Sequence, residues 1–121
     1  MNTNVINENG IKIAIVSSEE LIIKDVQSAL DFIATIYYDT GCTRIIINKE
    51  VVCEEFFDLK TRIAGEILQK FINYDTKVAI VGDYSEYTSN SLKAFIYESN
   101  NGRDIYFLSD EKEAILKLSK A

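Results

Sequence analysis

The stretch from residue 56 to residue 83 constrains the fold more than any other part of the chain. From Thr61 onward, apolar residues recur at helical spacing, while charged and amide side chains take the opposite side. The segment Lys77–Val81 follows; it is almost entirely apolar and stops at Gly82-Asp83, which is typical of a buried strand that ends in a turn. An amphipathic helix that leads directly into a buried strand predicts a small α/β domain.

The alternation of strands and helices extends over the rest of the chain. Strands are expected at 2–6, 11–16, 44–48, 77–81 and 104–108. Helices are expected at 26–40, 61–73, 90–100 and 110–121, with a short helical turn at 54–57. Asn9-Gly10 predicts a hairpin between the first two strands, because both residues tolerate positive φ. The sequence therefore predicts a single domain over residues 1–121, with a mostly parallel central sheet, an N-terminal hairpin, right-handed crossovers and about four helices.

Apolar spacing also predicts which helix faces are buried. In the first helix, which begins after Asp25 and ends at Gly41, one stripe is expected to face the core: Val26, Leu30, Ile33 and Tyr37. In the second helix the expected face is Ile63, Ala64, Ile67, Leu68, Phe71 and Ile72. Gly65 inside that helix costs about 1 kcal/mol relative to Ala. Close approach of a neighbouring strand or helix is the favoured reason for it, and approach of a ligand is the alternative.

Length, charge and hydropathy exclude several classes of protein. A chain of 121 residues that is 47% hydrophobic can bury a core without a metal or disulfide. The net charge is −6 and there is no basic run, so a nucleic-acid partner is disfavoured. No signal peptide is visible, and the apolar runs are far shorter than the roughly 20 residues of a membrane helix. We therefore expect a cytoplasmic protein without membrane contact, in which Cys42 and Cys53 are reduced.

The residue types that most often carry out catalysis are missing or poorly placed. There are no histidines, which removes the commonest general base and metal ligand. Cys42 has no histidine to lower its pKa, and the charges of Glu54 and Glu55 would raise the pKa of Cys53. Two separated cysteines do not supply the ligands of a zinc site. The sequence thus predicts a non-enzymatic protein without metal or cofactor.

Several segments, in this order and spacing, resemble a family of small uncharacterised bacterial proteins. They are Phe56–Leu59, Ala64–Phe71, Tyr74, Ala79–Asp83, Ser91-Leu92, Phe95–Asn100 and Gly102-Arg103. Together they cover nearly the whole chain. The resemblance implies membership of a family whose domain has no known function, and it carries no activity with it.

The order of elements is also similar to that of STAS domains, the fold of sulfate transporters and anti-sigma factor antagonists. Shared features are an initial hairpin, then alternating helices and strands over about 120 residues. In STAS antagonists a phosphorylatable serine in an Asp-Ser motif opens the helix after the central strand. The corresponding turn here is Asp58-Leu59-Lys60-Thr61, where only Thr61 could take a phosphate. The resemblance implies a regulatory module that docks a protein partner.

The loop after the strand at 77–82 is the first candidate site. Open α/β sheets bind ligands beyond the carboxyl ends of their strands, where Asp83, Tyr84, Ser85 and Thr88 would supply polar contacts. A single glycine, Gly82, is far from a phosphate-binding glycine motif. A tight turn is the alternative interpretation of the Gly-Asp pair.

The start of the long helix is the second candidate site, with Asp58, Thr61, Arg62 and Glu66 close together in sequence. Free backbone N–H groups at a helix start can hold a phosphate, here helped by Arg62. The alternative is a capped helix with a solvated charged face.

The seven tyrosines leave two interpretations open, an interface patch or partly buried rings with hydrated hydroxyls. Those considered are Tyr37, Tyr38, Tyr84, Tyr87 and Tyr97.

The leading functional hypothesis is a non-enzymatic, STAS-like regulatory or interaction module that docks a protein partner at the surface Asp58–Glu66. Homodimerisation is compatible with the sequence. The alternative is a small-molecule or nucleotide-binding domain that uses the loop Gly82–Thr88. A third hypothesis, an enzyme with Asp58, Glu66 or Asp83 as acid–base carboxylate, has no visible partner group for any of them.

Overall fold

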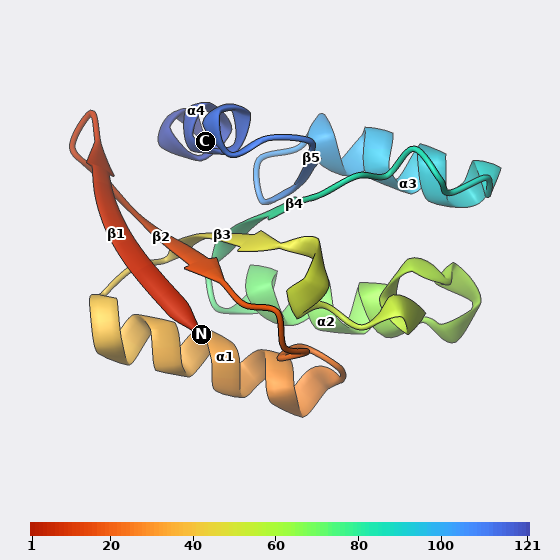
Figure 1. The fold of residues 1–121 in the computed structure, drawn as a ribbon, viewed down its shortest axis with the longest axis horizontal. Coiled ribbons are helices and arrows are strands. Elements are labelled where there is room, and N and C mark those ends of the chain that lie inside the picture. The colour runs from red at the N-terminus through yellow and green to blue at the C-terminus, as the bar shows by residue number, and fades with distance from the viewer.

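The computed structural model describes all residues from Met1 to Ala121 as one α/β domain (Figure 1). Its strands are β1 (Asn2–Glu8), β2 (Ile11–Ser17), β3 (Arg44–Asn48), β4 (Lys77–Val81) and β5 (Ile105–Leu108). Its α-helices are α1 (Val26–Thr40), α2 (Ile63–Asn73), α3 (Asn90–Asn100) and α4 (Glu111–Lys120). Three short 3₁₀ helices lie between β3 and α2: η1 (Lys49–Val51), η2 (Glu54–Phe57) and η3 (Leu59–Thr61). The predicted fold class is confirmed.

The five strands lie side by side in the order of the chain, β1-β2-β3-β4-β5. β1 is antiparallel to β2, and the remaining neighbours are parallel. The hairpin turns at Asn9 and Gly10, whose φ angles of 54° and 85° confirm the prediction from the Asn-Gly pair. Every helix that connects two parallel strands therefore joins neighbouring strands.

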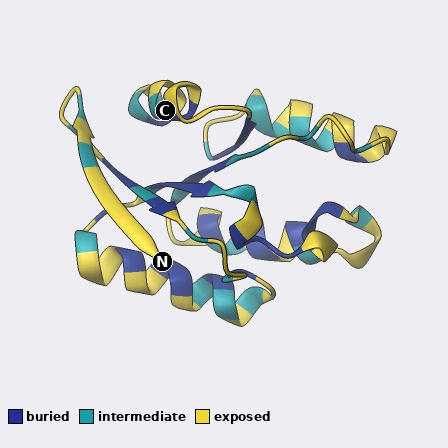
Figure 2. Cartoon of the chain, in the orientation of Figure 1, coloured by how far each residue is buried: buried dark blue, intermediate teal, exposed yellow.

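The sheet is covered unequally on its two sides. One side, here called the lower face, packs against α1, α2 and α3, and it includes Val16, Ile47 and Ile80. The opposite side, the upper face, packs against α4 alone and includes Ile13 and Ile46. Figure 1 shows α1 and α2 below the strands and α4 above them. Figure 2 shows that the buried positions concentrate on the inner strands, whereas β1 is largely exposed.

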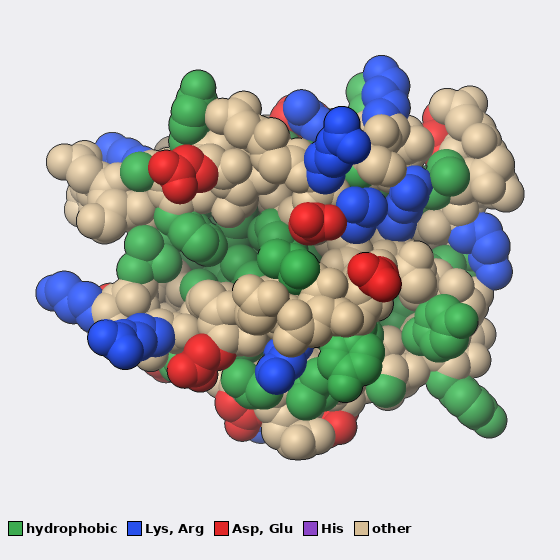
Figure 3. Space-filling view, turned by 180° about the vertical axis from the view of Figure 1, so that it is seen from behind, with side chains coloured by type: hydrophobic (Ala, Val, Ile, Leu, Met, Phe, Trp, Pro, Cys, Tyr) green, Lys and Arg blue, Asp and Glu red, His purple; other side chains and the backbone are tan.

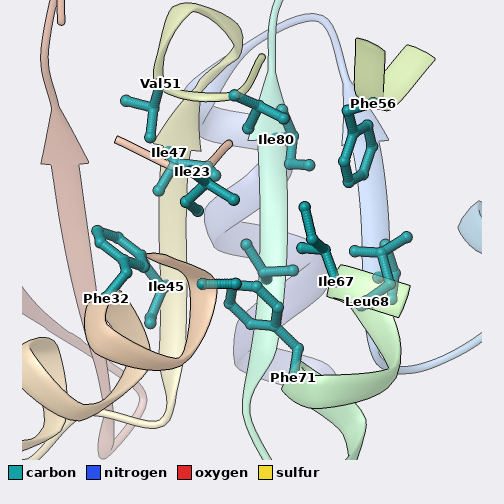
Figure 4. Packing of buried hydrophobic residues seen from close by; sticks show 14 of the residues in the cluster. Ile23, Phe32, Ile45, Ile47, Val51, Phe56, Ile67, Leu68, Phe71 and Ile80 are labelled. Carbon is teal, nitrogen blue, oxygen red and sulfur yellow. The ribbon is translucent and has the colours of Figure 1, made fainter. Parts of the chain in front are cut away.

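The lower face holds the larger core, a cluster of 24 buried residues. Figure 4 shows Ile67 and Phe71 of α2 directed toward β4, where Ile80 lies, with Phe32 of α1 beside Ile45 of β3. Because successive side chains of a strand point to opposite faces, the same strands supply both cores.

The upper face holds seven buried residues, two of them from α4, Ala114 and Leu118. Arg44 at the start of β3 fixes the end of this helix. Its guanidinium donates to the backbone oxygens of Leu118 (2.9 Å) and Ala121 (3.0 Å). Carbonyls at a helix C-terminus lack hydrogen-bond donors within the helix. Arg44 therefore supplies the donors that the last turn of α4 lacks.

The predicted ends of α1 are confirmed, but its predicted buried stripe is only partly right: Ile33 is buried, whereas Val26 and Leu30 are half-buried. Asp25 caps the helix in a capping box with Ser28, and Gly41 ends it in the left-handed conformation. The residues that face the core are Ala29, Phe32, Ile33 and Ile36. Tyr37 is 59% exposed. The contact face is rotated by about one residue position, which places the aromatic ring of Phe32 under the sheet instead of Tyr37.

Two predictions about the second helix are also wrong. The helix begins at Ile63 and not at Thr61, because Arg62 adopts a left-handed conformation (φ 65°) and separates η3 from α2. The short helical turn at 54–57 is confirmed as η2. Gly65 is exposed, and a Cβ there would meet no atom within 4 Å. Close approach of another element therefore does not explain this glycine.

Candidate functional site

One residue of each predicted site, Asp58 and Thr88, lines a groove at the carboxyl edge of the sheet, here called the edge groove. It has a volume of about 440 Å³ and lies between η2–η3 on one side and the loop from β4 to α3 on the other. It is lined by Glu54, Phe57, Asp58, Leu59, Lys60, Glu86, Tyr87, Thr88, Ser89 and Leu92. Figure 3 shows apolar side chains gathered in a hollow of the surface seen from behind. This volume is within the range of small-ligand pockets and of clefts that accept a peptide side chain.

Local hydrogen bonds build the η2–η3 wall. The carboxylate of Asp58 accepts from the backbone N–H of Lys60 (3.2 Å). The hydroxyl of Thr61 lies within bonding distance of the carbonyls of Glu55 (2.9 Å) and Asp58 (2.8 Å), so its proton is held inside the turn. Arg62 then reverses the backbone before α2. This segment is thus a folded-back turn in which Asp58 faces the groove.

The opposite wall is held by the loop after β4. The Asp83 carboxylate accepts from the backbone N–H of Ser85 (2.9 Å), and the Tyr84 hydroxyl donates to the Ile80 carbonyl (2.7 Å). The Ser89 side chain caps α3 by accepting from the N–H of Leu92 (3.2 Å). The Asp83 carboxylate, the Tyr84 hydroxyl and the Ser85 N–H therefore already have partners within the chain.

The side chain of Lys49 contacts residues of both walls. Lys49, the first residue after β3, places its Nζ 4.6 Å from the ring centre of Tyr87 and 5.4 Å from that of Phe57. It also lies 4.0 Å from a carboxylate oxygen of Glu86, and only 14% of its side chain is exposed. A cation over aromatic faces is attracted by their negative π-clouds, more strongly where water is excluded. Lys49 thereby joins the end of β3, η2 and the loop after β4.

The rings around Lys49 pack against one another. Tyr87 stacks on Phe57 with ring centres 5.3 Å apart, and its hydroxyl donates to Glu54 (2.8 Å). Gly82 leaves room for this arrangement, because a Cβ there would stand 2.6 Å from Cβ of Lys49. Gly82 is therefore required by the packing of Lys49.

The pKa shifts at the site arise from burial, local hydrogen bonds and neighbouring charges. Burial alone would lower the pKa of Lys49, but the Tyr87 side chain and the charges of Glu54 and Glu86 outweigh it, so the net shift is upward. The hydrogen bonds from Ser85 lower the pKa of Asp83. Burial raises the pKa of the Tyr84 hydroxyl. At neutral pH Lys49 is thus a cation and Asp83 an anion.

The rim of the edge groove is acidic and its floor is apolar. Three carboxylates line it, those of Glu54, Asp58 and Glu86. Two cations lie near them, the exposed Lys60 and the largely buried Lys49, which is 4.0 Å from Glu86. Phe57 and Leu92 are buried and form the apolar floor. This combination suits a ligand that carries both a positive charge and an apolar group.

The predicted site residues are only partly brought together. Asp58 and Thr88 line the edge groove from opposite walls. Thr61, Arg62, Asp83, Tyr84 and Ser85 do not line it. Glu66 lies on α2 at a separate hollow with Gly65 and Lys70.

Sequence reasoning missed the role of Lys49, and with it Phe57, Glu54 and Glu86. Tyr87 was named only as one of several tyrosines. A usable signal exists: Lys49 directly follows a buried strand, where side chains reach the carboxyl edge of the sheet. The aromatic residues that receive it are distant in sequence, so the chain alone does not indicate the cluster.

The cysteines have no part in this site. Both are free and buried. Burial raises the pKa of Cys53, and the charge of Glu55 adds to that shift. The predicted direction is confirmed, but of the two glutamates in the prediction only Glu55 contributes. No group of three or more His, Cys, Asp or Glu side chains is placed to hold a metal ion. None of the helices combines the length and hydropathy needed to cross a membrane.

Fold and site define a small α/β domain with an acid-rimmed groove and no motif of an established activity. The chain belongs to the family described as "Domain of unknown function (DUF4180)", which matches residues 8–118. The predicted membership of an uncharacterised family is thereby confirmed. No curated protein and no solved structure matches the chain.

Proposed function

We propose that this protein is a non-enzymatic, cytosolic interaction module that docks a basic segment of a protein partner in the edge groove. The observation that carries the proposal is the rim of Glu54, Asp58 and Glu86 above an apolar floor. A Lys or Arg side chain can place its apolar stem on such a floor while its charge meets the carboxylates. Electrostatic complementarity of this kind favours encounter with the correct partner and suppresses wrong ones.

The edge groove is a better docking surface than the helix start Asp58–Glu66 as a whole. Thr61 uses its hydroxyl inside the turn, and Arg62 reverses the chain away from the groove wall. Within that surface, Asp58 is the residue that lines the groove. The proposed docking surface is therefore centred on the edge groove, near Tyr87 and Thr88, and not on the helix start.

A regulatory role of the STAS-like kind remains part of this proposal at the level of topology. The initial hairpin and the parallel strands that follow in chain order support the analogy. Fold alone does not carry function, so the analogy adds a class of partner, another regulatory protein, and no residue roles. The alternative, a small-molecule site in the loop Gly82–Thr88, has less support because Lys49 packing accounts for Gly82.

The proposal is tested by a cation placed in the groove. Thr88 is exposed, lines the groove and makes no side-chain hydrogen bond in the structure, so Thr88→Arg fills the groove and places a second exposed cation among its three carboxylates without removing an internal hydrogen bond. Thr35→Arg, on the exposed side of α1, is the matched control. Tagged protein is used to capture partners from a lysate of the host, and bound proteins are quantified by mass spectrometry.

We expect a partner recovered in stoichiometric amount by the parent and by Thr35→Arg, with at least about tenfold less recovered by Thr88→Arg, equivalent to 1.4 kcal/mol. Recovery should fall as salt is raised, because exposed charges are screened. Arg62→Glu separates the two docking surfaces: unchanged capture supports the edge groove, and lost capture assigns docking to the helix start. Equal capture by Thr88→Arg and the parent would refute the groove.

A further inference from the structure

The two edges of the sheet differ in whether their free backbone N–H and C=O groups have hydrogen-bond partners. At the β5 edge, Asn100 of α3 covers the strand: its side-chain nitrogen donates to the Phe107 carbonyl (3.0 Å), and its oxygen accepts from the Phe107 N–H (2.7 Å). These are the two bonds that a neighbouring strand would make. β5 is also short, spanning Ile105–Leu108. Short edges covered by side chains are a usual protection against pairing with another chain.

The β1 edge has no such protection. β1 spans Asn2–Glu8, contains neither Pro nor Lys, and pairs with β2 in unbroken register, so no bulge turns it away. It is exposed along most of its length (Figure 2). Its single charge is that of Glu8, next to the turn. A strand of this kind is a template for pairing with another strand.

The register of the hairpin shows which groups are free. Glu8 and Ile11 flank a two-residue turn and so form a hydrogen-bonded pair. In an antiparallel pair such positions alternate, so Ile6 and Asn4 also bond to β2. The backbone N–H and C=O groups of Thr3, Val5 and Asn7 then point outward, away from the sheet.

We propose that β1 pairs antiparallel with β1 of a second copy of this chain, across a two-fold axis at Val5. In that register Val5 meets Val5 of the second copy, Thr3 meets Asn7, and Asn2 meets Glu8, so no charge lies opposite its own kind. Each outward-pointing residue exchanges both of its backbone hydrogen bonds. The paired β-branched side chains of Val5, each 40% exposed in the single chain, add a favourable cross-strand contact.

The self-complementary pattern favours a second copy over a foreign strand. An isologous two-fold contact uses the same edge of both chains and leaves none free. Because Asn100 covers part of the opposite edge, the joined sheet does not continue into a filament. The inference is independent of the edge groove, which lies at the carboxyl edge of the sheet and includes no residue of β1.

The test is a pair of lysine substitutions along β1. Val5→Lys places two cations directly opposite each other on the axis, whereas Thr3→Lys places the same charge opposite Asn7. Both positions are exposed, and neither donates its N–H to β2. Sedimentation equilibrium measures the dimer dissociation constant of each variant, and thermal unfolding followed by circular dichroism confirms that each is folded.

We expect a concentration-dependent dimer for the parent, little change for Thr3→Lys, and a dissociation constant weaker by about fivefold or more for Val5→Lys, because like charges directly opposite are destabilising. Hydrogen exchange at the Val5 amide should slow as the parent is concentrated. A parent that stays monomeric, equal weakening by both variants, or an unprotected Val5 amide in the dimer would each overturn the proposal. So would the finding that a strand of another protein occupies this edge.

Discussion

The two faces of the sheet are built from alternating residues of the same strands, yet one core is much larger than the other. On the lower face three helices cover the strands and 24 buried residues form one cluster. On the upper face α4 covers seven buried residues, and Ile6, Ile11 and Ile15 toward the hairpin are only partly buried. The strands cannot cause this difference, because their side chains alternate between faces.

The cause is the strand order. When neighbouring parallel strands follow one another in sequence, and every crossover has the same hand, all crossover helices fall on one side of the sheet. Only a helix after the last strand is free to cover the other side, and α4 does so with Arg44 holding its end. We therefore expect the packing on the lower face to contribute most of the stability of the domain, while the upper face depends on one terminal helix.

Phe71→Ala is expected to have the largest effect, a loss of about 3–5 kcal/mol in the free energy of unfolding, because it leaves a cavity in the lower core. The Phe71 side chain is 1% exposed. Urea unfolding followed by circular dichroism measures the loss. Ile72→Ala is the matched control on the same helix, since Ile72 is 42% exposed and should change stability much less. Equal losses for the two variants would show that α2 does not anchor the core.

Leu118→Ala is expected to cost about 2–3 kcal/mol, less than Phe71→Ala, because α4 can shift to close part of the cavity. Leu118 is fully buried on the upper face. Native-state hydrogen exchange should show faster opening of α4, with the lower-face strands and helices less affected. Leu116→Ala, at a position that is 52% exposed, is the control. If exchange accelerates equally throughout the chain, without a distinct response of α4, then the upper face is not a separately opening unit.

The fold is predictable from the sequence because most helices, strands and turns have a sequence signal within their own residues. The Asn9-Gly10 turn, the Asp25 cap and the strand Arg44–Asn48 are written in adjacent residues, and all three are confirmed. The buried stripe of α1 is predicted only in part, with Ile33 right and Tyr37 wrong, because several apolar residues compete for it and only contact with the sheet selects Phe32 over Tyr37. The late start of α2 depends on a left-handed Arg62, which composition does not indicate.

The candidate site was less predictable because it depends on residues distant in sequence. Lys49, Phe57 and Tyr87 come from three separate segments and meet only after the sheet has formed. Asp58 and Thr88 are candidates already in the sequence, but nothing in the sequence places them on opposite walls of one groove. The purpose of Gly82 likewise appears only once Lys49 packs against it.

The helix caps extend the comparison of the faces to a smaller effect, a dependence on pH. Asp25 and Ser28 of the lower-face helix α1 exchange hydrogen bonds in both directions, whereas Asp110 of α4 accepts from the Glu113 N–H without a reciprocal side-chain bond. The hydrogen bonds from Ser28, first that of its backbone N–H, lower the pKa of Asp25. A carboxyl whose pKa is depressed by folding stabilises the protein above its ordinary pKa, and this contribution is lost as pH falls through the lower folded value.

Asp25→Asn tests this, because asparagine also caps helices well but does not titrate. Near neutral pH the parent should be the more stable protein. Its advantage should shrink steadily as pH falls below the ordinary carboxyl range, when Asp25 takes up its proton. Thermal unfolding of both proteins across that range measures the difference, which should be smaller than either core effect because Asp25 is exposed to solvent. A constant difference at all pH values would mean that the charge of Asp25 contributes nothing and that the cap of α1 acts through hydrogen bonds alone.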